Sequence, residues 1–357
     1  MRQFFLLSLL LCAPAWGAAE GWDPSGFGDR PLDTPLELPA WFRVSFLDLN
    51  EDLADIRREG KRGLILYFGQ DDCPYCRAHL ENNWGRDDII AYTRKYFEVI
   101  HIDVRGSRTV TDLHGHSRPE NRFATELKVN FTPTLLFLDQ QGRVVYRLTG
   151  YRPPYYFRAA LEYVADGHYL KEGFRDYLAR AEAAEEYGND ALNASPLFRP
   201  PPYRLDRRRP DPKRVPLVVF FEAPRCHPCD VLHGGPMNNT AIAGRLRAFE
   251  AVQLDIRSET PVVTPQGVAT TARRWARDLG IVYAPTLVFF DEDGREILRI
   301  SSVIGFYRLN KVLDYILSRG YRDYPSYIAW RDRNKGRRPA PGDAPQGMPG
   351  ENPAPAP

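Results

Sequence analysis

The stretch Leu64-Ile65-Leu66-Tyr67-Phe68-Gly69-Gln70-Asp71-Asp72-Cys73-Pro74-Tyr75-Cys76 places an apolar run directly before a Cys-x-x-Cys pair. The same arrangement returns 153 positions later, where residues 217–221 read Leu-Val-Val-Phe-Phe and Cys226-His227-Pro228-Cys229 follows. A short continuous apolar run predicts a buried strand, and the polar turn after it leads into a helix that begins at the cysteine pair. The chain therefore carries two copies of one local arrangement, each of which brings two sulfur atoms together.

The similarity of the two copies extends well beyond the cysteines. Residues 103–143 match residues 255–295 without a gap, and Pro133 pairs with Pro285 in this alignment. Gene duplication is the simplest account of so many matches. Since 357 residues is about twice a common domain size, we expect two packed domains.

Each copy predicts the same order of elements. After the cysteine pair come a second strand, an amphipathic helix, two strands joined by a turn that ends in glycine, and a closing helix. In the first copy the expected elements after the cysteines are 99–104, 122–128, 134–138, 144–148 and 154–165. In the second copy the expected second strand, amphipathic helix and closing helix are 252–256, 271–279 and 306–318. The fold class expected from this order is α/β.

These features together resemble the thioredoxin superfamily. A Cys-x-x-Cys pair opens a helix after a buried strand, and Thr132-Pro133-Thr134 or Ala284-Pro285-Thr286 follows about 60 residues later. The resemblance covers about 45–185 and 212–333, and it implies two tandem thioredoxin folds, each a central mixed β-sheet flanked by helices. The first copy, with its Asp-Cys-Pro-Tyr-Cys start and its inserted 110–115 stretch, is most similar to the exported SoxW-type thioredoxins.

The spacing of the cysteines suits thiol–disulfide exchange. A cysteine at a helix N-terminus lies beside unpaired N–H groups and the positive end of the helix dipole, which stabilise its thiolate. The second cysteine, three positions later, lies on the same side of the helix and can resolve a mixed disulfide. We therefore expect Cys73 and Cys226 to be the nucleophiles and Cys76 and Cys229 to be the resolving cysteines.

The resemblance also implies a substrate-binding loop in each domain. Pro133 and Pro285 would be cis prolines, and each would hold the residue before it beside the sulfur to align an extended substrate segment. The substrate-binding residues implied in this way are Thr132, Pro133, Ala284 and Pro285.

Neighbouring residues are expected to tune the two cysteine pairs. They are Pro74, Tyr75, Glu222, Arg225, His227 and Pro228. Cations flank Cys226, whereas Asp71 and Asp72 precede Cys73, so the charges predict that Cys226 is the more acidic thiol. Thioredoxins also carry a buried aspartate six residues before the first cysteine, but here Tyr67 and Phe220 hold those positions, and Glu222 is the candidate substitute in the second copy.

The first 19 residues indicate a secretory signal peptide, with Arg2, an apolar run over 4–11 and small residues at 17–19. The apolar run is too short to span a bilayer, and no later segment is long enough. Cys12 falls within this signal, so the mature protein keeps four cysteines in a compartment where disulfides persist. Because each disulfide would close a very small ring, it would add little to the stability of the fold through loop entropy. Such a pair suits reversible redox chemistry better than structural stabilisation. We expect a periplasmic protein.

The net charge of the sequence limits the classes of partner that we expect. The net charge is only +2, so neither nucleic acid nor stable membrane insertion is expected. The partners implied are exported proteins with disulfides and a membrane thiol that donates electrons. No cofactor is expected beyond the redox-active disulfides, and no metal.

The segments around the two repeated modules are not expected to carry the chemistry. Residues 20–44 form an N-terminal extension, 45–187 the first domain with an accessory helix, 188–211 a proline-rich linker, 212–333 the second domain and 334–357 a disordered proline-rich tail. The arginine cluster formed by Arg204 and 207–209 is expected to be solvated, since it lies among prolines.

The favoured function is an exported protein-disulfide reductase with two Cys-x-x-Cys sites. Among enzymes, a disulfide isomerase or oxidase is the second candidate. Three non-enzymatic functions are also compatible with the sequence: a redox-inert binding module with static disulfides, one zinc site made by all four cysteines, and copper handling. For copper handling, His79, His101, His114 or His116 would assist Cys73 and Cys76.

Overall fold

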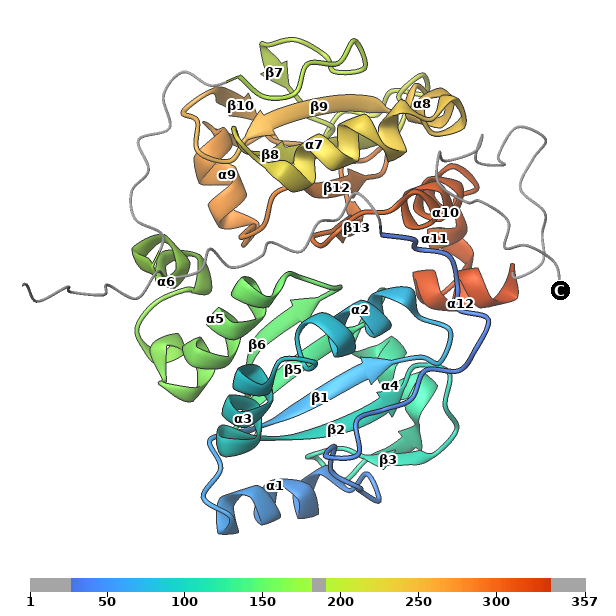
Figure 1. The fold of residues 1–357 in the computed structure, drawn as a ribbon. Helices are drawn as coiled ribbons and strands as arrows, with labels where there is room; N and C mark the ends of the chain where they lie inside the picture. The colour runs from blue at the N-terminus through green and yellow to red at the C-terminus, as the bar shows by residue number, and fades with distance from the viewer. Residues whose placement is uncertain (1–26, 182–190, 335–357) are drawn as a thin grey trace, which may run out of the picture.

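A computed structural model describes residues 27–181 and 191–334, and it contains two mixed α/β domains of the same architecture (Figure 1). The elements of the first domain are α1 (Leu49–Arg58), β1 (Gly63–Gly69), α2 (Pro74–Asn82), α3 (Asp87–Tyr96), β2 (Phe97–Asp103), β3 (Thr109–Thr111), β4 (Ser117–Pro119), α4 (Glu120–Glu126), β5 (Thr134–Asp139), β6 (Val144–Thr149), α5 (Pro154–Ala165), a 3₁₀ turn at His168–Leu170, and α6 (Phe174–Ala181).

The second domain repeats this order and adds helices at its C-terminal end. Its elements are β7 (Tyr203–Arg204), β8 (Leu217–Glu222), α7 (His227–Gly234), a 3₁₀ turn at Pro236–Asn238, α8 (Thr240–Leu246), β9 (Glu250–Asp255), β10 (Pro261–Val263), β11 (Ala269–Thr271), α9 (Ala272–Asp278), β12 (Thr286–Phe290), β13 (Glu296–Ile300), α10 (Phe306–Leu317), α11 (Gly320–Asp323) and α12 (Tyr327–Arg333).

The central sheets have the same strand order. The first sheet runs β2-β1-β5-β6 and the second runs β9-β8-β12-β13. In both sheets the first two strands in sequence pair in parallel, and the last two pair antiparallel to each other. The α/β fold class and the two tandem thioredoxin folds predicted from the sequence are confirmed.

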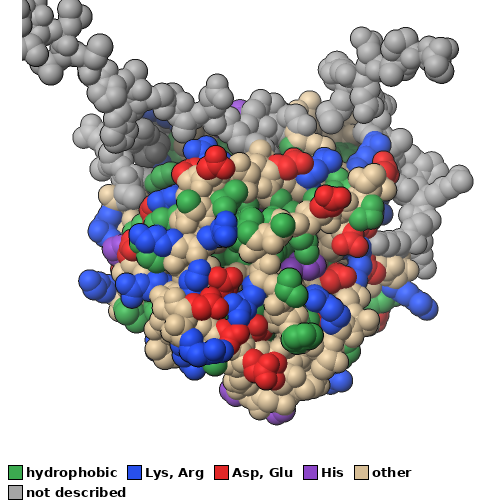
Figure 2. Space-filling view, turned by 60° about the horizontal axis from the view of Figure 1, so that its bottom comes forward, with side chains coloured by type: hydrophobic (Ala, Val, Ile, Leu, Met, Phe, Trp, Pro, Cys, Tyr) green, Lys and Arg blue, Asp and Glu red, His purple; other side chains and the backbone are tan. Residues whose placement is uncertain are grey.

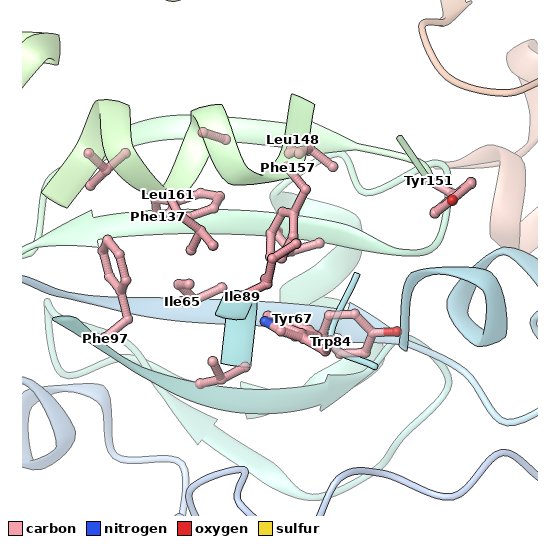
Figure 3. Close-up of a cluster of buried hydrophobic side chains, with 14 of the residues drawn as sticks. Ile65, Tyr67, Trp84, Ile89, Phe97, Phe137, Leu148, Tyr151, Phe157 and Leu161 are labelled. Carbon is pink, nitrogen blue, oxygen red and sulfur yellow. The ribbon is translucent and has the colours of Figure 1, made fainter. Parts of the chain in front are cut away.

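The central strand of each sheet is buried on both faces, so an unbroken apolar run suits it. Ile65 and Tyr67 point into a core that includes residues of α2, α3 and α5, whereas alternate residues such as Leu66 face a second core with α1 and α4. Figure 3 shows the first of these cores, in which Phe137, Phe157 and Leu161 belong to the same cluster of buried side chains as Ile65 and Tyr67 of β1.

Several elements were not anticipated. Helices α3 and α8 follow the cysteine helices, and the inserted stretch after β2 forms the hairpin β3–β4 rather than an irregular loop. Asp48 caps α1, because its carboxylate accepts the N–H groups of Asn50 and Glu51.

The expected linker is partly built into the second domain. Strand β7 pairs in parallel with β10, and Leu205 is buried in that domain's core. Arg207 is also buried, and it donates to the carbonyl oxygens of Val215 and Asp291 and to the Glu250 carboxylate. The prediction of a solvated arginine cluster is therefore wrong for Arg207, because its two terminal nitrogens find three acceptors inside the fold and the Glu250 carboxylate balances its charge.

The N-terminal extension is likewise ordered where the structure describes it. Residues 27–44, blue in Figure 1, run from the second domain to the first. Phe42 packs in the first domain's core, and Asp29 accepts the N–H groups of Tyr307 and Arg308 at 2.9 and 2.8 Å. Asp29 thus caps helix α10 of the second domain from the far end of the chain.

The predicted signal peptide, the C-terminal tail after residue 334 and residues 182–190 lie outside the described residues. Across 27–181 and 191–334, the helices are all too short or too polar to cross a membrane. Figure 2 displays one face of the molecule, on which basic and acidic side chains are interspersed.

Replacing Asp29 should destabilise the protein, because three donors would lose a buried acceptor: the two N–H groups of α10 and the Tyr75 hydroxyl. We expect Asp29→Ala to lower the free energy of unfolding by about 2 kcal/mol in urea titrations. Asp33→Ala, in the exposed part of the same segment, is the matched control and should change it by less than about 0.5 kcal/mol. Equal effects of the two substitutions would contradict this role of Asp29.

Candidate active site

Both Cys-x-x-Cys pairs form disulfides at the start of a helix. Cys73 bonds to Cys76 and Cys226 bonds to Cys229, with a Cα–Cα distance of 5.1 Å in each case. The two pairs therefore hold four sulfur atoms in two separate disulfides rather than in one four-sulfur site.

In each pair the first cysteine is the N-cap residue of its helix. The Cys73 sulfur accepts the Cys76 N–H at 3.0 Å, and the Cys226 sulfur accepts the Cys229 N–H at 3.2 Å. Pro74 occupies the first turn of α2, where its missing N–H loses no bond. This geometry places each nucleophilic sulfur where backbone N–H groups and the helix dipole stabilise a thiolate.

Each domain has a cis proline directly before the third strand of its central sheet, β5 or β12. The Thr132–Pro133 and Ala284–Pro285 peptide bonds are both cis, as the resemblance implied. In the first domain the Thr132 hydroxyl donates to the Cys73 sulfur at 3.2 Å. Ala284 has no hydroxyl to offer Cys226, so the two sites differ in this hydrogen bond. A third cis bond, Pro201–Pro202, was not anticipated.

The two sites differ most in exposure. Cys73 is 2% exposed and Cys76 is fully buried, whereas Cys226 is partly exposed and Arg225 and His227 beside it are exposed. The difference arises because the second domain covers the first site. The sequence could not show this, since repeats predict matching domains but not how the domains pack.

Tyr75, predicted only as a tuning residue, is the centre of the contact between the domains. Its hydroxyl donates to Asp29 at 2.8 Å and accepts the Gly305 N–H at 3.0 Å. The Arg308 guanidinium lies 3.2 Å from the centre of its ring. Gly305 is required here, because a Cβ at that position would lie 2.3 Å from the Asp29 carboxyl carbon. We refer to Asp29, Tyr75 and Arg308 as the clamp.

Arg308 reaches from α10 to the cis-proline loop of the first domain. Its Nη2 donates to the Thr132 carbonyl at 3.2 Å and its Nη1 donates to the Ser302 hydroxyl at 2.9 Å. The side chain is buried, and this desolvation lowers the pKa of Arg308, against the opposing effects of Tyr75 and Asp29. Arg308 was missed from the sequence because its partners in the first domain, Thr132 and Tyr75, lie more than 170 positions away.

The acidic residues before Cys73 do not act alone. Asp72 pairs with Arg105 at 2.7 Å, and Arg105 also pairs with Asp332 of α12 at 2.9 Å. The predicted contrast in charge between the two sites is therefore smaller than the flanking residues indicate, since Arg105 offsets Asp72. The higher acidity of Cys226 stays a prediction.

Strand β8, which leads to the second cysteine pair, ends in a buried carboxylate, Glu222. Glu222 has no exposed surface, and its oxygens lie 2.9 Å from His233 Nε2 and 2.9 Å from the Gln253 amide nitrogen. His233 follows Cys229 by four positions on α7, so both side chains share one helix face. Glu222 was predicted as a tuning residue, and His233 was not anticipated.

The corresponding region of the first domain is uncharged. Tyr67 holds the position of the missing aspartate, and its hydroxyl and the Nε2 of His79 are buried without a hydrogen-bond partner within the described residues. Burial raises the pKa of Tyr67 and lowers the pKa of His79 to about 3. His79 is therefore neutral at physiological pH, with the Asn83 amide donating to its Nδ1.

The histidines proposed for copper are not gathered at the first disulfide. His79 packs in the core against Trp84 and Phe157, and His114 and His116 are exposed in the β3–β4 hairpin. Burial also lowers the pKa of His101. In the described part of the chain, no three His, Cys, Asp or Glu side chains are grouped so as to hold a metal ion.

A strand that leads to an N-terminal disulfide on a helix, opposite a cis-proline loop, defines a thioredoxin-fold redox site, and this chain has two. Comparison with protein families agrees with this class. A model described as thioredoxin-like domain matches residues 49–165 and again 207–317. The two matches together span more than half of the chain, which therefore belongs to the thioredoxin-like family.

Solved structures of thioredoxin-fold proteins are similar to single domains of this chain. A thioredoxin-fold protein from Helicobacter pylori is 23% identical over 34% of this chain and 80% of its own, with a TM-score of 0.28. A thioredoxin from Thermus thermophilus is 26% identical over 35% and 91%, also at 0.28. A disulphide isomerase from Xylella fastidiosa Temecula1 is 20% identical over 42% and 99%, at 0.24. These scores are too low to identify an activity. A comparison with curated proteins gave no match.

The buried neutral His79 predicts a loss of stability in acid. Its pKa is about 3 in the folded protein but near 6.5 in the unfolded chain, so the unfolded state binds the extra proton between these values. The free energy of unfolding should fall as the pH drops below about 6.5, with a slope from this residue that approaches 1.4 kcal/mol per pH unit.

Urea titrations between pH 7.5 and 4.5 measure this slope. His79→Gln should flatten it by about 1 kcal/mol per pH unit. His114→Gln, in the exposed hairpin, is the control and should leave the slope unchanged. A slope that is the same in all three proteins would show that His79 does not titrate differently on folding.

Proposed function

We propose that this chain is an exported protein thiol–disulfide oxidoreductase that reduces disulfides with its two Cys-x-x-Cys pairs. The observation that carries the proposal is the repeated geometry: in both domains a helix begins at the first cysteine, and a cis-proline loop belongs to the same domain. Membership of the thioredoxin-like family supports the same reaction class.

The second pair is the one open to protein clients, since Cys226 is partly exposed. In the reduced protein the Cys226 thiolate attacks a client disulfide. The client S–S bond breaks, a mixed disulfide forms, and one client thiolate leaves. Cys229 then attacks the Cys226 sulfur, which forms the Cys226–Cys229 disulfide and releases the second client thiolate. Two electrons pass from the cysteine pair to the client.

The resolving step requires Cys229 to lose its proton. Cys229 is fully buried, so water is a poor acceptor for this proton. The buried Glu222, with His233 bonded to it on the face of α7 that carries Cys229, supports a role as the proton acceptor. We assign to this pair the function that the missing aspartate has in thioredoxins.

The first pair carries out the same exchange with Cys73 as nucleophile and Cys76 as resolving cysteine. The Thr132 hydroxyl supports this role, because a hydrogen bond to the sulfur stabilises its thiolate. The predicted signal peptide supports export to the periplasm, where a membrane thiol would return electrons to both pairs. The similarity of the first domain to SoxW-type thioredoxins is part of this proposal.

Insulin reduction with dithiothreitol as electron source tests the proposal. The intact protein should accelerate precipitation of the insulin B chain well above the dithiothreitol background. Cys226→Ser should remove most of this rate, because it deletes the exposed nucleophile, and Cys73→Ser/Cys226→Ser should return it to background.

Glu222→Gln is the companion variant, and Glu292→Gln, on a surface turn of the same domain, is its matched control. If Glu222 accepts the Cys229 proton, Glu222→Gln should slow turnover about tenfold or more at pH 7 and less at higher pH, where hydroxide competes for the proton. An intact protein with no rate above background would contradict the proposed function.

A further inference from the structure

A pocket of about 360 Å³ lies between the first disulfide and the second domain. Cys73, Gln70 and Asp72 line it from the first domain, and Tyr307, Lys311 and Arg331 line it from the second. The second domain thus forms a wall of the first active site. The function proposed above does not explain this wall, because a protein client needs an open surface.

The clamp occupies the surface that an extended client segment would use. In this fold a client strand aligns beside the residue that precedes the cis proline, and in the first domain that residue is Thr132. Its carbonyl already accepts a hydrogen bond from Arg308 at 3.2 Å. Cys73 keeps only 2% of its surface exposed. A main-chain segment therefore cannot lie against this loop while Arg308 is in place.

The closed arrangement is stabilised by buried polar groups. Arg308 is 7% exposed and stacks on Tyr75, and Asp29 holds the first N–H groups of α10. Withdrawing the second domain would take the Gly305 N–H from the Tyr75 hydroxyl, the two α10 N–H groups from Asp29 and the Thr132 carbonyl from Arg308. Each of these buried polar groups would then lack a partner. These contacts therefore stabilise the closed form of the first site.

More cationic than acidic side chains line the pocket. Four cationic side chains line it, Arg105, Arg308, Lys311 and Arg331, against the two acidic side chains of Asp29 and Asp72. Both acids are engaged, since Asp29 caps α10 and Asp72 pairs with Arg105. Arg331 donates to Gln70 through Nη2 at 2.6 Å and pairs with Asp332 at 3.7 Å, and Lys311 pairs with Asp314 at 3.8 Å. The Nε of Arg331 is buried and donates no hydrogen bond within the described residues. Aromatic walls, Phe131, Tyr307, Tyr327 and Trp330, complete the lining.

We infer that the first cysteine pair exchanges electrons with a small disulfide or thiol that carries carboxylates, held in this pocket, rather than with a protein segment. The inference rests on the proposed thiol–disulfide chemistry and assigns a substrate class to one of its two sites. Lys311 and Arg331 would bind the carboxylates, and the aromatic walls would contact the apolar part of the ligand.

The exchange balances without any further reactant. The Cys73 thiolate attacks a small disulfide, whose S–S bond breaks as the Cys73 mixed disulfide forms and one small thiolate leaves. The first small thiolate accepts the proton of the fully buried Cys76 as it leaves. Cys76 then attacks the Cys73 sulfur, and the second small thiolate leaves. The dithiol is oxidised by two electrons and the small disulfide is reduced to two thiols. The reverse sequence reduces the pair.

The test uses the full chain with Cys226→Ser and Cys229→Ser, so that only the first pair reacts. The reduced protein is mixed with glutathione disulfide, which is acidic, with neutral 2-hydroxyethyl disulfide, or with cationic cystamine, and its loss of thiols is followed. Each rate constant is divided by the rate constant of the Cys73→Ser/Cys76→Ser protein with the same disulfide, because only the second pair reacts in that protein.

We expect this ratio to be at least about tenfold higher for glutathione disulfide than for cystamine. The preference for glutathione disulfide should shrink in 1 M salt.

Charge variants locate the effect in the pocket. Lys311→Gln/Arg331→Gln should lower the rate with glutathione disulfide about tenfold and the rate with the neutral disulfide less than about twofold. Lys311→Gln alone should give part of this loss, and it leaves the domain contact in place because Lys311 pairs with Asp314 of its own helix. Lys171→Gln/Arg209→Gln, at two exposed positions, is the matched control and should change neither rate.

Equal ratios for the three disulfides would overturn the inference alone, and so would oxidation of the first pair by insulin as fast as oxidation of the second. Failure of every disulfide to oxidise the first pair would instead contradict the proposed function of that pair. Loss of both the acidic and the neutral rates in Lys311→Gln would also overturn the inference, since it would indicate a structural role for that residue.

Discussion

The N-terminus of helix α10 cannot be buried unless its free N–H groups find acceptors, and this constraint joins the two halves of the molecule. Asp29 supplies the acceptor for Tyr307 and Arg308, and the Tyr75 hydroxyl supplies it for Gly305. Asp29 comes from a segment ahead of the first domain, and Tyr75 comes from between its two cysteines. A capping requirement of one domain is therefore met by the active-site helix of the other.

Duplication has produced two sites with one chemistry and different surroundings. Both keep the N-terminal cysteine and the cis-proline loop, because these set the thiolate and its position. The second site is open and has Glu222 and His233 behind its buried cysteine. The first site is covered, has uncharged Tyr67 and His79 behind it, and faces a cationic pocket. We account for the difference as a division of substrates, with proteins at Cys226 and small acidic thiols at Cys73.

Much of the fold could be predicted from the sequence, because it is encoded in local patterns. The apolar runs at 64–68 and 217–221 predicted the central strands, and the paired prolines at 133 and 285 predicted the two loops. The packing of the domains could not be predicted in this way. The burial of Tyr75 depends on Asp29 and Arg308, which lie 46 residues before it and 233 residues after it. Proline-rich composition also concealed β7 and the buried Arg207, since composition does not show which acceptors a charged side chain will meet.

The central claim is that the second domain closes the first cysteine pair and leaves the second pair open. Reaction of the reduced protein with N-ethylmaleimide and with a maleimide attached to a polymer of about 5 kDa tests it directly, with mass spectrometry to assign the modified cysteine. At each cysteine, the rate with the polymer maleimide is divided by the rate with N-ethylmaleimide. Both reagents attack the same thiolate, so its reactivity affects both rates equally and the ratio reports steric access alone. We predict that this ratio is at least about tenfold lower at Cys73 than at Cys226, and that Arg308→Ala raises it only at Cys73. Equal ratios at the two cysteines of the intact protein would contradict the account.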